Sequence, residues 1–147
     1  HERSLDWHLA ETPERQGFQQ FLQDLGSLYR DSSSLWRRDP DPESFAWIDC
    51  TDRENSVISY LRRDGDHFLV VVCNLTPVPH DNYRVGVPAP GRYVQRFSSD
   101  DRRYGGSEFE TPGELETEGA PFHGHDQSLR LRLPPLGALV LGPAAQR

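Results

Sequence analysis

Alternation of apolar and polar residues over short segments is the feature that most constrains how this chain folds. The pattern is clearest near the C-terminus, where Leu129, Leu131 and Leu133 are separated by Arg130 and Arg132. Successive side chains of a strand point to opposite faces, so this spacing predicts a strand with its leucines inward and its arginines in solvent.

Short segments of this kind occupy the sequence from Phe45 onward, and clusters of glycine and proline separate them. The segment that ends at Asn74 is apolar on both faces, which is typical of a central strand. The expected strands cover residues 45–49, 57–63, 68–74, 83–87, 93–98, 115–118, 128–133 and 138–141. About seven or eight short strands joined by turns predict a mainly β fold, an antiparallel β-sandwich.

One amphipathic helix is predicted ahead of the strands, from Thr12 to Arg30. Pro13 suits the first helical position, and Thr12 can cap it. The apolar residues of one helical face are Phe18, Phe21, Leu22, Leu25, Leu28 and Tyr29. Burying such a set is worth on the order of 10 kcal/mol. We therefore expect this face to dock on the β body or on a second molecule, or to stay partly exposed in this chain alone.

The composition changes near residues 38–44, where Pro40 and Pro42 end the helical part. The alternating pattern begins directly after this stretch. The predicted division is a helical segment over residues 1–38 and an all-β domain over residues 39–147.

Charge and composition exclude several classes of partner. The net charge of −7 argues against nucleic acid, whose phosphates require a clustered basic face. No apolar segment approaches the roughly 20 residues that cross a bilayer, so no membrane partner is expected. All 16 basic residues are arginine, which excludes a lysine Schiff base and a P-loop lysine, and no cofactor is expected. We expect a cytoplasmic location.

Metal-binding motifs are incomplete in this sequence. His123 and His125 supply two imidazoles, whereas zinc takes at least three protein ligands. The stretch Asp64–Asp66 resembles the start of a calcium loop, but Leu75 stands where the closing Glu belongs. We therefore expect a polar loop at His123–His125, a hairpin turn at Asp64–Asp66, and no metal site.

The two cysteines, Cys50 and Cys73, both fall near expected strand ends. Two isolated thiols in a chain of this length do not make a disulfide framework. We expect two buried thiols rather than a bridge.

No residue stands out as catalytic. The glycine-rich stretch at residues 104–107 lacks the following helix that a phosphate site needs, and no GxSxG elbow is present. The many carboxylates show no spacing that singles out an acid–base pair. The Asn74–Thr76 stretch is a glycosylation sequon, which only a secreted protein would use.

Trp47 is the one candidate for ligand contact. It lies on an alternating strand with polar neighbours, on the same predicted face as Phe45. An exposed indole can stack on the apolar C–H surface of a sugar ring, and packing in the core is the alternative for any aromatic residue.

Six blocks of the sequence occur in an order that resembles a known family. They read SLDWHL, GFQQFLQDLGSLYR, FAWIDCTDRENSVISYLRR, VCNLTPVPHDNYRVGVPAPGRY, YGGS and HGHDQSLRLRLPPLGALVLGP. Together they resemble the C-terminal region of the bacterial 1,4-α-glucan (glycogen) branching enzymes, of the α-amylase superfamily.

This resemblance implies a division of labour within a longer protein. The helix resembles the last helix of a catalytic (β/α)8 barrel, with residues 1–38 at the barrel's C-terminal end and residues 39–147 as the C-terminal all-β domain. The family's catalytic carboxylates lie on upstream barrel strands, and no position here matches their motifs. The implied partners are an α-glucan and the barrel itself, and we expect this chain to be inactive alone. The start at His1 without Met fits a piece of a longer chain.

Some positions depart from the family pattern, notably Gly26–Ser27, Leu75 and Phe122. The family often has Phe in place of Leu75 and Trp in place of Phe122. Three other interpretations remain open. One is a stand-alone carbohydrate-binding β-module with Trp47 as its platform. Another is the C-domain of a different amylase-superfamily enzyme, such as a trehalose-releasing hydrolase. The third is a β-sandwich interaction domain without a sugar role.

Overall fold

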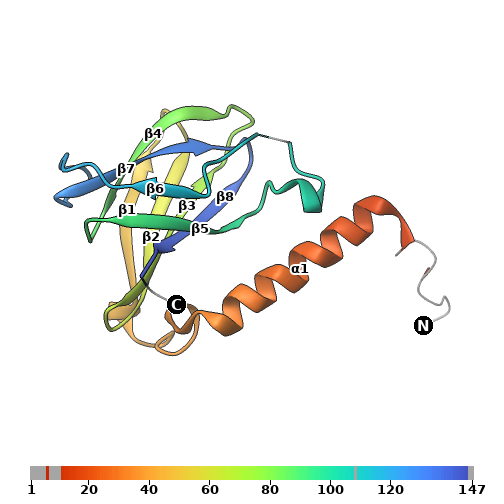
Figure 1. Cartoon of the computed structure of the whole chain (residues 1–147), viewed down its shortest axis with the longest axis horizontal. Coiled ribbons are helices and arrows are strands. Elements are labelled where there is room, and N and C mark those ends of the chain that lie inside the picture. The colour runs from red at the N-terminus through yellow and green to blue at the C-terminus, as the bar shows by residue number, and fades with distance from the viewer. Residues whose placement is uncertain (1–5, 7–10, 108, 146–147) are drawn as a thin grey trace.

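A computed structural model describes residues 6, 11–107 and 109–145 of the chain. In this part of the chain, one long helix, α1 (Pro13–Asp31), precedes a body of eight strands (Figure 1). The strands are β1 (Phe45–Asp52), β2 (Val57–Asp64), β3 (His67–Asn74), β4 (His80–Val87), β5 (Arg92–Ser98), β6 (Glu114–Glu116), β7 (Gln127–Leu133) and β8 (Ala138–Pro143). Three single-turn helices lie in the connections: η2 (Ser33–Leu35) and η3 (Pro42–Ser44) between α1 and β1, and η4 (Arg102–Tyr104) between β5 and β6.

The strands form two antiparallel sheets. Six strands pair in the order β1-β2-β3-β8-β5-β6, and β4 pairs with β7 in the second sheet. The predicted antiparallel β-sandwich is therefore confirmed. β1 and β4 are longer than expected because backbone pairing continues through register shifts that interrupt the alternation of side chains.

The main core lies between the two sheets. The leucines of β7 point inward and are almost fully buried, while Arg130 is exposed, as the alternation predicts. They pack with Val70, Val72 and Tyr93 of the six-stranded sheet. The two-stranded sheet thus covers one face of the larger sheet.

A second apolar cluster covers the opposite face of the six-stranded sheet. Leu69, Val71, Phe97 and Val140 form its buried part, and residues of α1, η2 and η4 pack against it. The central position of β3, predicted from its apolar residues on both faces, is confirmed because β3 contributes to both clusters. Figure 1 shows α1 and the β4–β7 pair on opposite sides of the larger sheet.

The apolar face of α1 is divided between the sheet and solvent. Phe21 and Leu28, two helical turns apart, pack on the second cluster. The other four residues of the face remain exposed, and we call them the outer stripe: Phe18 at 59%, Leu22 at 51%, Leu25 at 37% and Tyr29 at 50%. The expectation that this face would dock on the β body or stay partly exposed is confirmed in both respects. No helix among the described residues is long and apolar enough to span a bilayer.

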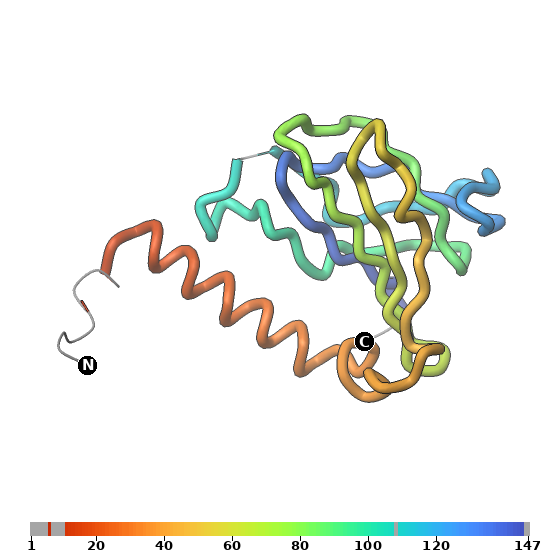
Figure 2. The backbone as a smooth tube through the Cα atoms, turned by 180° about the vertical axis from the view of Figure 1, so that it is seen from behind, coloured from red at the N-terminus to blue at the C-terminus, as the bar shows by residue number. Residues whose placement is uncertain are grey.

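Gly17 allows the first half of α1 to approach η4 closely. A β-carbon at this position would lie 3.0 Å from the carbonyl oxygen of Tyr104. The second half of the helix reaches the sheet and the η2 turn, as the backbone trace in Figure 2 shows. The helix is therefore held along its length by one face only.

The cysteines correct one expectation. Cys73 is half-buried, and burial raises the pKa of its thiol. Cys50 is exposed and free, so the prediction of two buried thiols is wrong for this residue. The reason is its place on the edge strand β1, where the pairing with β2 loses its regular register.

Replacing Phe21 with alanine should destabilise the chain much more than replacing Phe18. The Phe21 ring lies 5.5 Å from Phe97 and 5.4 Å from Tyr104, measured between centroids. We expect Phe21→Ala to lower the free energy of unfolding by about 2–3 kcal/mol, and Phe18→Ala to change it by less than about 0.5 kcal/mol. Urea unfolding followed by circular dichroism measures both values. Equal losses would contradict the division of the helix face.

Candidate functional site

Trp47 is the exposed member of an aromatic cluster on the outer face of β1 and β2. Its ring centroid lies 5.0 Å from Phe45 and 5.9 Å from Tyr60, both in edge-on geometry, and 53% of the residue is exposed. The prediction that Phe45 and Trp47 share a face is confirmed. Tyr60 also packs against the second cluster, so this aromatic cluster lies on the same side of the sheet as α1.

This geometry suits stacking on a sugar. The two neighbouring rings restrict the indole, so little conformational freedom remains to be lost when a ligand binds. The exposed surface of Trp47 is large, flat and apolar, which matches the C–H face of a pyranose. Whether a glucan contacts Trp47 remains a prediction.

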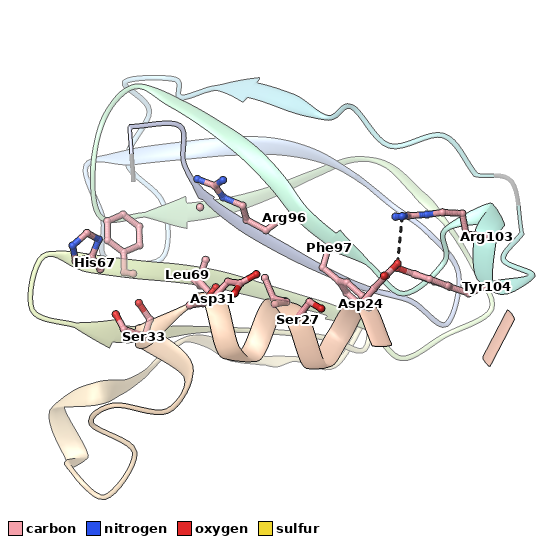
Figure 3. A pocket seen from close by; sticks show the side chains of 15 residues that line it. Asp24, Ser27, Asp31, Ser33, His67, Leu69, Arg96, Phe97, Arg103 and Tyr104 are labelled. Atoms are coloured by element: carbon pink, nitrogen blue, oxygen red, sulfur yellow. Dashed lines mark hydrogen bonds and ion pairs between the residues drawn. The ribbon is translucent and has the colours of Figure 1, made fainter. Parts of the chain in front are cut away.

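A second candidate site is the groove between α1 and the outer face of the six-stranded sheet, which we call the helix groove (Figure 3). It encloses about 500 Å³. Apolar residues form its floor: Leu28, Leu69 and Phe97. Its helix side carries Asp24, Ser27, Asp31 and Ser33, and its strand and η4 side carries His67, Arg96 and Arg103.

One end of the helix groove is closed by a charged tie between α1 and η4. The Tyr104 hydroxyl donates to Asp24 Oδ2 at 2.7 Å, and Arg103 Nη1 lies 3.3 Å from the same oxygen. The hydrogen bond from Tyr104 lowers the pKa of Asp24 below its ordinary value, with further lowering by Gln20 and Arg103. Burial and the Asp24 carboxylate raise the pKa of Tyr104 to about 12. Asp24 is therefore a charged structural group at neutral pH.

The helix groove contains two carboxylates but not the arrangement that retaining glycosyl transfer requires. Asp24 and Asp31 lie two turns apart on one helix, about 10 Å along its axis, whereas a nucleophile and an acid flank the substrate about 5–5.5 Å apart. Such a pair also needs one raised carboxyl pKa. The described carboxyls with a displaced pKa all shift downward: Asp24, Asp41, Asp52, Asp101 and Glu118.

His123 and His125 of the HGH stretch do not form part of a metal site among the described residues. Residues 122–125 form a tight turn in which the Phe122 and His125 backbones exchange hydrogen bonds. His123 Nε2 lies 3.5 Å from Asp49 Oδ2, and burial lowers the pKa of both imidazoles. Within residues 11–107 and 109–145, no three His, Cys, Asp or Glu side chains are grouped to hold a metal ion.

Other stretches singled out in the sequence have structural roles. Asn74 is buried, and its amide donates to the carbonyls of Val78 and Pro134, so the sequon nitrogen is already engaged. Gly106 packs on the backbone of Asp100, whose carboxylate accepts hydrogen bonds from Ser107. The Asp64–Asp66 stretch forms the β2–β3 turn, as predicted. The first block, residues 4–9, lies outside the described residues except for Asp6.

Replacing Asp24 with asparagine should destabilise the chain in a pH-dependent way. Because the folded-state pKa of Asp24 is lowered from 3.8, its contribution is present above that value and is lost as pH falls through the folded pKa. We expect Asp24→Asn to lower the free energy of unfolding at pH 7. At pH 3 the free energies of unfolding of the variant and the parent chain should be more nearly equal. Urea unfolding at both pH values measures this, with the exposed Asp31→Asn as control. A penalty that is the same at both pH values would contradict the charged tie.

Comparison with known proteins identifies the family to which the chain is similar. The model of the alpha amylase C-terminal all-beta domain matches residues 47–144. The 1,4-alpha-glucan branching enzyme GlgB of Cellvibrio japonicus (strain Ueda107) is 47% identical over 141 residues, which cover 96% of this chain and 19% of that protein. Its counterpart in Trichodesmium erythraeum (strain IMS101) is 48% identical over 138 residues, covering 92% and 18%.

The chain spans about a fifth of the length of the curated relatives that it matches. The resemblance to bacterial branching enzymes, inferred from six sequence blocks, is confirmed by these identities. The family model covers the strands of both sheets, from Trp47 in β1 to the end of β8. The chain therefore belongs to the family of the alpha-amylase C-terminal all-beta domain.

Proposed function

We propose that this chain is the C-terminal portion of a 1,4-α-glucan branching enzyme and that the chemical step takes place in a part of the enzyme outside it. The observation that carries the proposal is the identity of 46–48% with branching enzymes over more than nine-tenths of the chain but only about a fifth of theirs. In this reaction a carboxylate displaces the glucan across an α-1,4 bond to form a covalent glycosyl intermediate, and an acid protonates the leaving oxygen. A glucan 6-hydroxyl then replaces water as acceptor, gives its proton to the same acid–base residue and releases the carboxylate.

The division at residues 38 and 39 forms part of the proposal. Residues 1–38 would belong structurally to a catalytic barrel, and residues 39–147 would form the C-terminal domain. The outer stripe of α1 supports this division, because four large apolar side chains remain exposed after the helix has docked on the sheet. A barrel packed on the outer stripe would remove these side chains from water.

A stand-alone carbohydrate-binding module fits these observations less well. Such a module gains nothing from an exposed apolar helix face, which lowers solubility. The relatives named above are branching enzymes, which favours that activity over a trehalose-releasing hydrolase for the whole protein. The chain itself would support the barrel and contribute a glucan contact at Trp47.

Transplanting this chain into a working branching enzyme tests the proposal. We expect a chimera in which it replaces the matching region of the Cellvibrio japonicus enzyme to form α-1,6 branches on amylose, measured by proton NMR. The purified chain alone should form none. A chimera carrying Leu22→Asp and Leu25→Asp should lose activity, because two carboxylates would be buried against the barrel. A folded but inactive parental chimera, or turnover by the chain alone, would refute the proposal.

Replacing Trp47 with alanine should weaken binding of maltoheptaose. The lost stacking surface corresponds to a roughly three- to tenfold rise in the dissociation constant. Trp36→Ala is the matched control, because Trp36 is also exposed, at 40%, but its ring is already covered by the Arg37 guanidinium, 5.7 Å from the ring centroid. Isothermal titration calorimetry measures all three affinities. Unchanged binding by Trp47→Ala would end the proposed contact.

A further inference from the structure

A bulge in β1 creates a polar hollow at the open edge of the sandwich. Trp47 pairs with Tyr60 on the outer face, but the register then shifts, and Asp49 pairs with Ser59, a buried residue of the core face. Strict alternation would place Asp49 beside Trp47. Bulges commonly redirect a side chain in this way, and here Asp49 turns toward the second sheet.

Three segments far apart in the sequence line this edge hollow. β1 contributes Asp49 and Asp52, the start of β4 contributes His80 and Tyr83, and the 122–125 turn contributes Phe122 and His123. The hollow encloses about 640 Å³, within the range of small-molecule sites. It is distinct from the aromatic cluster around Trp47, which lies on the other face of the sheet.

The polar groups of the edge hollow are positioned by the protein and retain hydrogen-bonding capacity. The Tyr83 hydroxyl donates to Asp52 at 2.9 Å, and Asn55 donates to both oxygens of the same carboxylate. His80 Nε2 is buried and has no hydrogen-bond partner. The carboxylate of Asp49 accepts from Thr51 through one oxygen and lies 3.5 Å from His123 through the other. A ligand with hydroxyl groups, which both donate and accept, would complement such a mixture.

The charged side chains that line the edge hollow favour a neutral ligand. Burial lowers the pKa of His123, so the imidazole is neutral at pH 7 although Asp49 and Asp52 oppose this effect. Although burial opposes it, hydrogen bonding from Asn55 and Tyr83 holds the pKa of Asp52 below its ordinary value. Asp81 and Arg84 also line the hollow, so its carboxylates outnumber its one arginine, which disfavours phosphates and other anions.

An apolar ring lies at the rim. Phe122 is 39% exposed and is backed by the His123 ring, whose centroid lies 4.1 Å away. A rigid aromatic face beside fixed carboxylates and imidazoles is the combination that binds a pyranose, with C–H groups on the ring and hydroxyls on the polar groups.

We propose that the edge hollow is a second glucan-binding site, which holds a short α-1,4-glucan segment with Phe122 as its stacking surface and Asp49 and His123 as partners for its hydroxyls. The choice of glucan rests on the proposed function. The site acts independently of Trp47 and would anchor the polymer away from the site of chemistry.

Titration of maltoheptaose into the isotope-labelled chain, followed by amide NMR, tests this proposal. We expect the resonances of Gly86, Phe122 and His123 to shift with one common dissociation constant, and cellohexaose, a β-1,4-linked glucan of similar length, to leave them in place. Gly86 reports on the site because its amide lies 3.5 Å from His123 Nδ1. Absence of shifts at these residues would overturn the proposal, as would equal shifts with cellohexaose.

Three variants make the test specific. Phe122→Ala should raise the dissociation constant measured at the hollow about three- to tenfold, and Phe122→Trp should restore or tighten binding through its larger face. Trp47→Ala should leave the hollow shifts unchanged. If Phe122→Ala does not fold, the stacking role is tested by Phe122→Trp alone. Weaker glucan binding by folded Phe122→Trp would overturn that role. Loss of the hollow shifts in Trp47→Ala would show that the hollow is no independent site.

The outcome is separable from the proposed function. A chimera that branches amylose, combined with a hollow that does not respond to maltoheptaose, would overturn this inference and leave the branching assignment standing. A responsive hollow combined with an inactive chimera would retain the glucan site and refute the assignment.

Discussion

The six-stranded sheet has apolar side chains on both faces, and the rest of the structure follows from the need to cover both. Val70 and Val72 of β3 face the two-stranded sheet, whereas Leu69 and Val71 face α1. A sandwich alone would leave the second face in water, at a cost of about 25 cal/mol for each Å² of apolar surface. The helix thus covers the outer face of the β body, although it precedes that body in the sequence.

The same helix has more apolar surface than this sheet can cover. Phe21 and Leu28 contact the sheet, whereas the outer stripe, which lies beside them on the same apolar face, remains exposed. An apolar face that is broader than one contact covers is typical of an element that lies between two bodies. In the proposed assembly, the helix would fix the small β domain to the catalytic barrel.

Irregularities of the edge strand separate the two candidate glucan sites. Before the bulge, β1 presents Phe45 and Trp47 on the helix side; after it, Asp49 and Asp52 face the second sheet. One strand therefore supplies an aromatic surface to one face and carboxylates to the other. Edge strands tolerate such shifts because one of their sides has no neighbouring strand to disrupt.

The sequence by itself determined the helix, the eight strands and the fold class, because periods of 3.6 and 2 record which side chains are buried. It also determined that Phe45 and Trp47 share a face. Only the tertiary structure decided that Asp49 leaves that face, that Cys50 is exposed, and that Phe122, His80 and Asp52 meet in one hollow. These features depend on a bulge and on contacts between distant segments, neither of which leaves a periodic signal along the chain.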